Sequence, residues 1–188
     1  MSSGALIVIA VIVVIAVALI LIYNGLVSGR LEVRNAWSQI DIQLKRRHDL
    51  IPNLVNTVKG AMEMEKSQLT AVMEARNAAV AAKTPAQSMQ AENVLTGALR
   101  QLFAVVESYP QLRSQQNVSG LMEELSSTEN KIAFARQHYN DAVQAQNIRV
   151  TAFPGVMVAG IFGFTPETMF VVPEAEHAAV EAVPEVKF

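Results

Sequence analysis

An unbroken run of 18 apolar residues, ALIVIAVIVVIAVALILI at positions 5–22, limits this chain more than any other feature. The run contains no charge, proline or glycine. As a helix it would be about 27 Å long, close to the thickness of the hydrocarbon core of a bilayer. A helix inside a soluble protein would carry polar residues somewhere around its circumference, and this one has none. We therefore expect residues 1–24 to form a membrane anchor that contacts the lipid bilayer through 5–22.

The residues on either side of the run indicate whether it is a cleaved signal peptide and how the chain is oriented in the membrane. A cleaved signal peptide is the alternative to an anchor, but the run is longer than usual and no basic segment precedes it. The leading MSSG has no Lys or Arg, whereas Arg30 and Arg34 follow the run, with Lys45, Arg46 and Arg47 further along. The positive-inside rule then predicts a single-pass protein with its N-terminus outside and the remainder in the cytoplasm. The absence of cysteine excludes a disulfide framework and thiolate metal sites.

Beyond Asn24 the apolar residues recur at the three- and four-residue spacing of helices, with almost no strand pattern. We predict an all-α fold, in which the N-terminal transmembrane helix leads into an antiparallel four-helix bundle of long helices. The predicted bundle helices continue from the anchor through the hinge points Gly25 and Gly29, then span about 50–83 and 85–107, and start again near 110. Thr84, Pro85 and Gln87 form a typical helix start. The last helix carries a stripe typical of a bundle core: Leu121, Leu125, Thr128, Ile132, Ala135, Tyr139, Ala142 and Gln146.

The domain boundaries follow changes in composition. The bundle would occupy 25–150. Residues 151–172 are apolar but interrupted by proline and glycine, and they are too short to cross a bilayer. This segment is either a lid over the end of the bundle or an exposed docking surface. Residues 173–188 read as an acidic, solvated tail.

The segment LKRRHDLIPNLV at 44–55 combines three cations, a His-Asp pair and a proline. Two interpretations stay open. Asp49 caps a new helix that has Pro52 in its first turn, or one long helix kinks at Pro52, which lacks an N–H and clashes with the carbonyl of His48. Either one predicts a basic elbow that serves as an interaction site, made of Lys45, Arg46, Arg47, His48, Asp49 and Pro52.

Polar residues also fall on or beside the apolar seams. One interpretation is an interhelical polar network, formed by Arg76, Glu129, Arg136 and Tyr139. Partly buried pairs of this kind would fix the register between helices more than they would add stability. The other interpretation is a set of solvated helix faces, with pairs such as Asp41–Lys45 four residues apart.

Sequence motifs for catalysis are absent. The chain has no HExxH, GxSxG, GxxxxGK[ST] or GxGxxG. Its net charge of −2 argues against nucleic-acid binding. We expect no cofactor, no metal and no enzymatic activity; a hydrolase or metal enzyme built on His48, Asp49 and the bundle carboxylates is the competing hypothesis.

Three stretches resemble the LemA family. They are YNGLVSGRLEVRNAWSQIDIQLKRRHDLIPNLVNTVKGAMEMEKSQLTAVMEAR, then SYPQLRSQQNVSGLMEELSSTENKIAFARQHYNDAV, and finally FPGVMVAGIFGF. Departures are small: AMEME stands where the family usually has an aromatic-containing run after KG, and QAQN stands where a Tyr-Asn pair is typical. The resemblance implies a bacterial single-pass protein of the cytoplasmic membrane with an antiparallel four-helix bundle. It implies no established enzymatic role. Family links to a magnetosome membrane and, by genomic association, to a membrane zinc protease point to scaffold or adaptor work.

The expected function is that of a membrane-anchored interaction scaffold, self-assembling as a homo-oligomer or acting as an adaptor for a membrane protease or membrane-organising system. Its protein partners are not identified by the sequence. The alternative function is a lipid-surface-binding or membrane-remodelling module, which would use the basic juxtamembrane segment and the apolar C-terminal segment.

Overall fold

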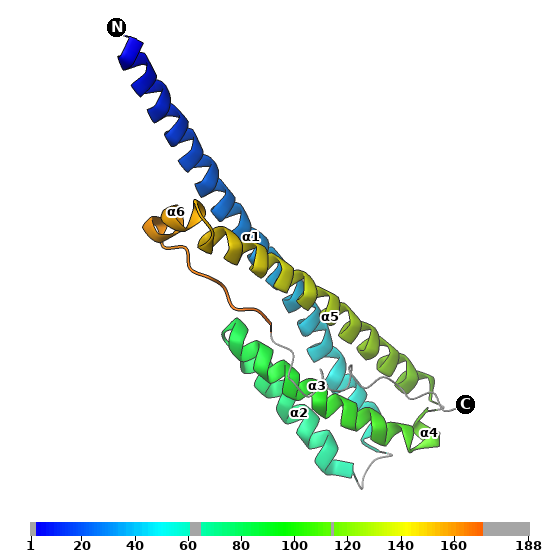
Figure 1. The fold of residues 1–188 in the computed structure, drawn as a ribbon. Coiled ribbons are helices and arrows are strands. Elements are labelled where there is room, and N and C mark those ends of the chain that lie inside the picture. The colour runs from blue at the N-terminus through cyan, green and yellow to red at the C-terminus, as the bar shows by residue number, and fades with distance from the viewer. Residues whose placement is uncertain (1–2, 61–64, 114, 171–188) are drawn as a thin grey trace, which may run out of the picture. The chain divides into compact units, whose positions relative to one another are not determined.

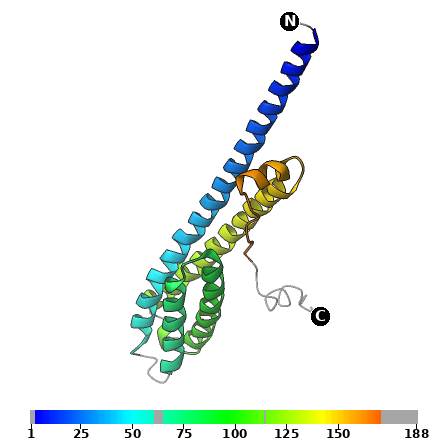
Figure 2. The same ribbon diagram turned by 90° about the vertical axis from the view of Figure 1, so that its left-hand side faces the viewer.

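The computed structural model describes residues 3–60, 65–113 and 115–170. Every regular element in these ranges is a helix (Figures 1 and 2): α1 (Ser3–Val58), α2 (Lys66–Ala81), α3 (Pro85–Glu107), α4 (Pro110–Arg113), α5 (Gln116–Thr151) and α6 (Gly155–Phe162). The predicted all-α class is therefore confirmed, and so is the long apolar helix at the N-terminus. The prediction of an acidic tail at 173–188 lies outside the described residues.

Helix α1 is continuous from the apolar run to the end of the LKRRHDLIPNLV segment. Residues 3–21 are all exposed, so no other part of the described chain covers them. This stretch is long and apolar enough to cross a membrane, judged by length and composition. Gly25 and Gly29 are interior positions of the helix rather than breaks in it.

The continuity of α1 corrects one interpretation of Pro52. A new helix capped by Asp49 is wrong, because Pro52 lies inside α1, which ends only at Val58. The second predicted helix, 50–83, is accordingly shortened to α2 at Lys66–Ala81. The third is confirmed: α3 starts at Pro85, and the Thr84 hydroxyl accepts a hydrogen bond from the Gln87 amide at 3.3 Å. Near 110 the chain forms the short α4 before α5 begins.

The chain divides into two compact units, of which the first comprises Met1–Asp41 and Phe134–Met169. Here the first part of α1, the last part of α5 and α6 share a small core of Leu26, Val150, Val158, Ala159 and Phe164. The buried amide of Gln146 on α5 donates to the Leu26 carbonyl on α1 at 3.1 Å. A side chain at Gly29 would collide with Gln146 and Arg149, so this glycine serves close packing of α5 on α1.

The same unit contains a glycine whose replacement should be destabilising. A Cβ at Gly155 would meet the backbone carbonyl of Arg149, which has no flexible side chain to move aside. Gly155→Ala is expected to weaken the docking of α6 by about 1–3 kcal/mol, as overpacking usually does. The measurement is amide hydrogen exchange across α6, which should become faster. Gly160→Ala is the matched control, because Gly160 on the same helix has open space around it; equal exchange in both variants would contradict the packing argument.

The second unit comprises Ile42–Ala133 and Phe170–Phe188. In Figures 1 and 2, α2 and α3 lie side by side within it. One hydrophobic core takes residues from the end of α1, from α2, α3 and α4, and from the start of α5: Ile51, Leu54, Val55, Val58, Leu69, Val72, Ala75, Ala79, Leu95, Leu99, Leu102, Val106, Leu112, Val118 and Leu125. This core holds together the helices that carry the site described next.

Candidate functional site

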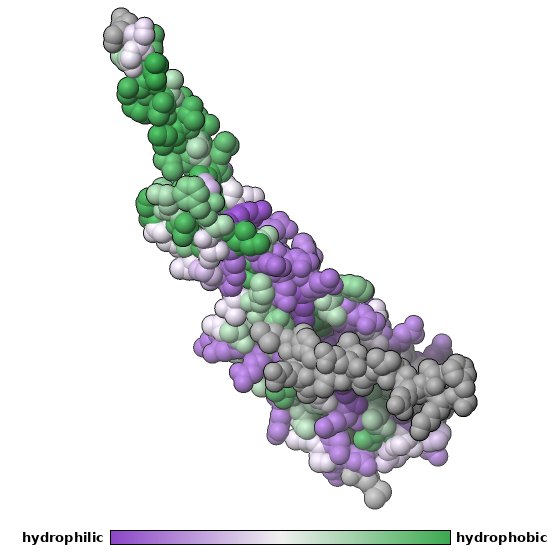
Figure 3. Space-filling view, in the orientation of Figure 1, coloured by the Kyte–Doolittle hydropathy of each residue, from purple (hydrophilic) through white to green (hydrophobic). Residues whose placement is uncertain are grey.

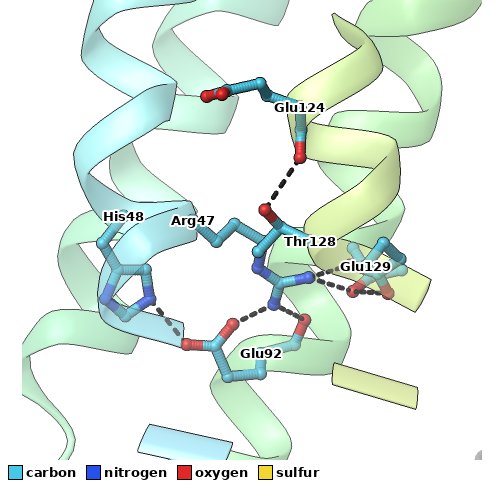
Figure 4. A network of polar contacts seen from close by, with 7 residues as sticks. Arg47, His48, Glu92, Glu124, Thr128 and Glu129 are labelled. Atoms are coloured by element: carbon cyan, nitrogen blue, oxygen red, sulfur yellow. Dashed lines mark hydrogen bonds and ion pairs between the residues drawn. The ribbon is translucent and has the colours of Figure 1, made fainter. Parts of the chain in front are cut away.

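Arg47 lies at the centre of a buried polar cluster in the second unit. Its side chain is 0% exposed although it is among the most hydrophilic in proteins. The guanidinium donates to the carboxylate of Glu92 on α3 and to that of Glu129 on α5, and Figure 4 shows it lying between them. It also donates to the hydroxyl of Thr96 at 3.0 Å. A single side chain of α1 is therefore bonded to two other helices.

Glu92 is the second fully buried member of the cluster. Besides Arg47, its carboxylate contacts Nε2 of His48 at 2.6 Å. Burial by itself would raise the pKa of Glu92, but the hydrogen bond with His48 and the positive charge of Arg47 outweigh it, and the pKa is lowered below its ordinary value. Glu92 is thus held as a carboxylate by its partners.

The lowered pKa of Glu92 makes stability depend on pH with a definite sign. Below the ordinary pKa of Glu, about 4.3, the unfolded chain takes up a proton that the folded chain does not, so folding loses free energy as the pH falls. The contribution of Glu92 is fully present above that pH and is lost as the pH drops through the folded-state value. We expect thermal unfolding in detergent to show a midpoint that falls on acidification, and Glu92→Gln to flatten this dependence. An unchanged pH dependence in Glu92→Gln would contradict the assignment.

Glu129 and Thr96 complete the cluster. The Thr96 hydroxyl donates to Glu129 at 3.3 Å, while the Glu129 side chain is 37% exposed and reaches solvent. We call Arg47, His48, Glu92, Thr96 and Glu129 the Arg47 cluster. Its members come from α1, α3 and α5, and every carboxylate in it has a cationic or hydroxyl partner. The cluster links α1, α3 and α5, but buried ion pairs of this kind are by themselves weak evidence of net stability, because apolar residues of similar volume can replace them without loss.

Arg76 explains how α1 tolerates a proline in its interior. Pro52 has no N–H, so the carbonyl of His48, four residues earlier, loses its partner within the helix. The Nε of Arg76 on α2 donates to this carbonyl at 3.2 Å. The side chain of a second helix thus supplies the hydrogen bond that the proline removes.

This arrangement predicts an interaction between two positions distant in sequence. Arg76→Met should lower the free energy of unfolding by about 1–3 kcal/mol, because it leaves a partly buried carbonyl without a donor. Pro52→Ala restores an N–H to α1, so it should leave the fold intact, stiffen the helix and reduce the loss caused by Arg76→Met. Chemical unfolding of the two single variants and the double variant checks this. Strictly additive losses would mean that Arg76 does not act through the His48 carbonyl.

The other residues of the predicted basic elbow and of the predicted polar network lie in several separate places. In the basic elbow, Lys45 and Asp49 are exposed, and Arg46 forms an exposed pair with Glu124 at 3.3 Å. In the predicted network, Arg76 and Glu129 belong to the second unit, and Arg47 provides the basic partner of Glu129. Arg136 and Tyr139 belong to the first unit, where Arg136 is half-buried.

Tyr139 has a well-defined place in the first unit. Its ring packs edge-on against Trp37 at a centroid distance of 5.5 Å, and its hydroxyl donates to the Thr168 carbonyl at 3.0 Å. Burial and the charge of Glu167 raise the pKa of Tyr139. This tyrosine therefore fastens the segment after α6 to α1 and α5.

Sequence reasoning missed Glu92 and Thr96. The available signal was their position: Glu92 and Thr96 fall on the same helical face as Met89, Leu95 and Leu99, all of them buried. An acid in such a seam requires a buried cation. Thr128 on the α5 stripe is a simpler case, because its hydroxyl donates to the Glu124 carbonyl within its own helix at 2.8 Å (Figure 4).

The chemistry open to the Arg47 cluster is limited. Arg47 and Glu92 are closed to solvent, and the carboxylates already bind cations or hydroxyls. Among the described residues, no group of three or more His, Cys, Asp or Glu side chains could hold a metal ion. The geometry is that of a clamp between helices.

Comparison with known proteins gives a consistent assignment. The family model described as "LemA family" matches residues 36–188. Magnetosome proteins MamQ 2 and MamQ 1 of Paramagnetospirillum magneticum are each 28% identical over 188 residues, which covers 85% of this chain and 69% of the relative. Magnetosome protein MamQ of Magnetospirillum gryphiswaldense is 24% identical, covering 78% of this chain and 63% of the relative. Because the family model covers most of the sequence, including the Arg47 cluster, the chain belongs to the LemA family.

Proposed function

We propose that this chain is a non-enzymatic, membrane-anchored helical scaffold that presents its soluble helices to a protein partner or to further copies of itself. The observation that carries the proposal is the continuity of α1. One helix has a fully exposed apolar stretch at its start and the buried Arg47 close to its end. The helix that would enter the bilayer is thereby the same helix that is clamped to α3 and α5.

The proposal includes the finer features expected from the sequence. The soluble helices would form an antiparallel four-helix bundle, the N-terminus would lie outside a bacterial cytoplasmic membrane, and the bundle would lie in the cytoplasm. The relatives are named magnetosome proteins, and by analogy we propose work within a membrane-associated assembly for this chain too. The burial of Arg47 and Glu92, and the cationic or hydroxyl partner that each carboxylate of the Arg47 cluster already has, support a structural role over catalysis.

The alternative of an electrostatic lipid-surface module has less support from the basic residues. Arg47 is buried, Arg46 pairs with Glu124, and Arg30 stacks on the ring of Phe164 at 4.0 Å. These three cations therefore have partners within the protein. Of the five cations in the basic juxtamembrane segment, Arg47 is closed to headgroups and Arg46 is paired at the surface, which leaves Arg34 and Lys45 exposed.

The scaffold proposal is tested by proximity labelling in cells that produce the full chain with a labelling enzyme at its C-terminus. We compare the native chain, a chain whose residues 3–24 are exchanged for an unrelated single-span anchor, and that unrelated anchor carrying only the labelling enzyme. A scaffold should label the same neighbours with either anchor, and these should be absent from the third sample. If the native chain labels no protein beyond those labelled by the bare anchor, the proposal is wrong.

A further inference from the structure

Helix α6 is apolar on both faces, although only one of them is packed. Gly155, Val158 and Ala159 are buried against α1 and α5. On the other face of α6, Met157 and Ile161 are four residues apart and are 63% and 77% exposed. Phe153, in the turn before the helix, is 80% exposed. The whole stretch from 153 to 164, FPGVMVAGIFGF, contains no charged residue. A contiguous exposed apolar face of this kind marks a site of interaction with a protein or a membrane.

The position of α6 along α1 indicates which partner that is. The ring of Tyr23, directly after the apolar run, lies 4.8 Å from that of Phe162 and 6.0 Å from that of Phe164. Leu26, one turn further along, packs in the same core as Val158. In Figure 3 the green surface of α6 adjoins the green surface of the first part of α1. The exposed face of α6 thus continues the exposed apolar surface of the span.

The first charged residues of α1 lie directly beside the end of this apolar surface. Arg30 stacks over the ring of Phe164 at 4.0 Å, and its guanidinium donates to the Gly163 carbonyl at 3.5 Å. Glu32 and Arg34 follow on α1 and are exposed. Aromatic rings next to the first cations after an apolar span are typical of the membrane–water interface. With only eight residues, α6 is about 12 Å long and cannot cross a bilayer.

We propose that the exposed apolar surface of α6 and of the turn before it, formed by Phe153, Met157, Ile161 and Phe162, is embedded in the interfacial layer of the bilayer that α1 crosses. The chain then contacts one leaflet twice, through the anchor and through a short helix lying beside it. The inference rests on the proposed anchoring by α1 but adds a separate lipid contact. A bilayer fits this face better than a second copy of the chain does, because the face is continuous with the span and carries no charge that would orient a partner.

The experiment uses the lack of cysteine, which allows single nitroxide labels in the full chain without background. Ile161→Cys tests α6, Ile15→Cys tests the anchor, and Ile42→Cys is the matched control, an isoleucine 65% exposed on a later part of α1. The labelled chains are reconstituted into vesicles of neutral phosphatidylcholine and into vesicles with added anionic lipid. Label accessibility to oxygen and to a water-soluble nickel complex then reports immersion depth.

Position 15 should be deep in the bilayer, position 161 at interfacial depth, and position 42 in water. Because the contact is apolar, the result at 161 should be the same in neutral and anionic vesicles. A water-exposed label at 161 beside a buried label at 15 would overturn the α6 proposal alone, whereas water exposure at 15 would overturn the anchor itself. Dipolar broadening between labels at 161, with no immersion, would assign the face to a second copy and also refute the proposal.

Discussion

Replacing Arg47 with methionine is expected to lower the free energy of unfolding by about 3–5 kcal/mol, the usual loss when one partner of a buried ion pair is removed. The cause is Glu92, whose 0%-exposed carboxylate would lose its cation while staying closed to water. Chemical unfolding of the detergent-solubilised full chain, followed by circular dichroism, measures the loss.

The neighbouring arginine provides a matched control. Arg46 and its partner Glu124 are both half exposed, so Arg46→Met should change the free energy of unfolding by at most about 1 kcal/mol. Removing both buried charges in Arg47→Met/Glu92→Met should recover most of the loss, since a buried pair can be replaced by apolar residues of similar volume. Similar losses for Arg46→Met and Arg47→Met would contradict the account of the cluster.

Introducing two arginines into the apolar run, Val13→Arg together with Val14→Arg, is expected to prevent stable membrane insertion. Each arginine at the centre of a span adds about 2.5–3.5 kcal/mol to the free energy of insertion, so the pair adds about 5–7 kcal/mol. That sum is comparable to the favourable contribution of the whole run. Alkaline carbonate extraction of membranes should retain the native chain and release the double variant.

A double substitution to leucine at the same two positions is the control that separates the effect of charge from the effect of side-chain size. Val13→Leu/Val14→Leu keeps both positions apolar and should stay in the carbonate-washed membrane. Both side chains are more than half exposed in the structure, so neither substitution disturbs a protein core. Retention of the double-arginine variant in the membrane would show that residues 5–22 are not the anchor.

The parts of this fold that the sequence predicts are those governed by neighbouring residues. The apolar run indicates a span by its length alone, and Thr84, Pro85 and Gln87 specify the start of α3 through contacts at most four residues apart. The stripe on α5 predicts burial at Leu125, Ile132 and Tyr139, because helical period decides which side chains share a face.

The parts that were missed depend on residues far apart in the chain. At Pro52 the sequence leaves a new helix and one long kinked helix open, because the compensating donor, Arg76, lies 24 residues later. Glu92 shows no motif of its own, since its partners Arg47 and His48 come from another helix. Periodicity identifies which face a residue is on, but it does not identify which helix covers that face.

The LKRRHDLIPNLV segment has features that the sequence predicts and features that depend on other helices. Its composition correctly marks it as unusual, yet its cations have three different situations: Lys45 is exposed, Arg46 forms a surface pair, and Arg47 is buried. Helical geometry explains the difference, because three consecutive residues point in directions about 100° apart and only one can face the core.

We propose above that the chain works as a tethered scaffold, in which the Arg47 cluster is structural. The most direct measurement compares proximity labelling by the native full chain with labelling by the full-length Arg47→Met/Glu92→Met variant. The variant is first shown to be folded and membrane-bound. We expect the same labelled neighbours at similar intensity, because the substituted side chains are buried and hold helices together. Loss of those neighbours from a folded, membrane-bound variant would contradict this proposal and assign the cluster a direct part in the function.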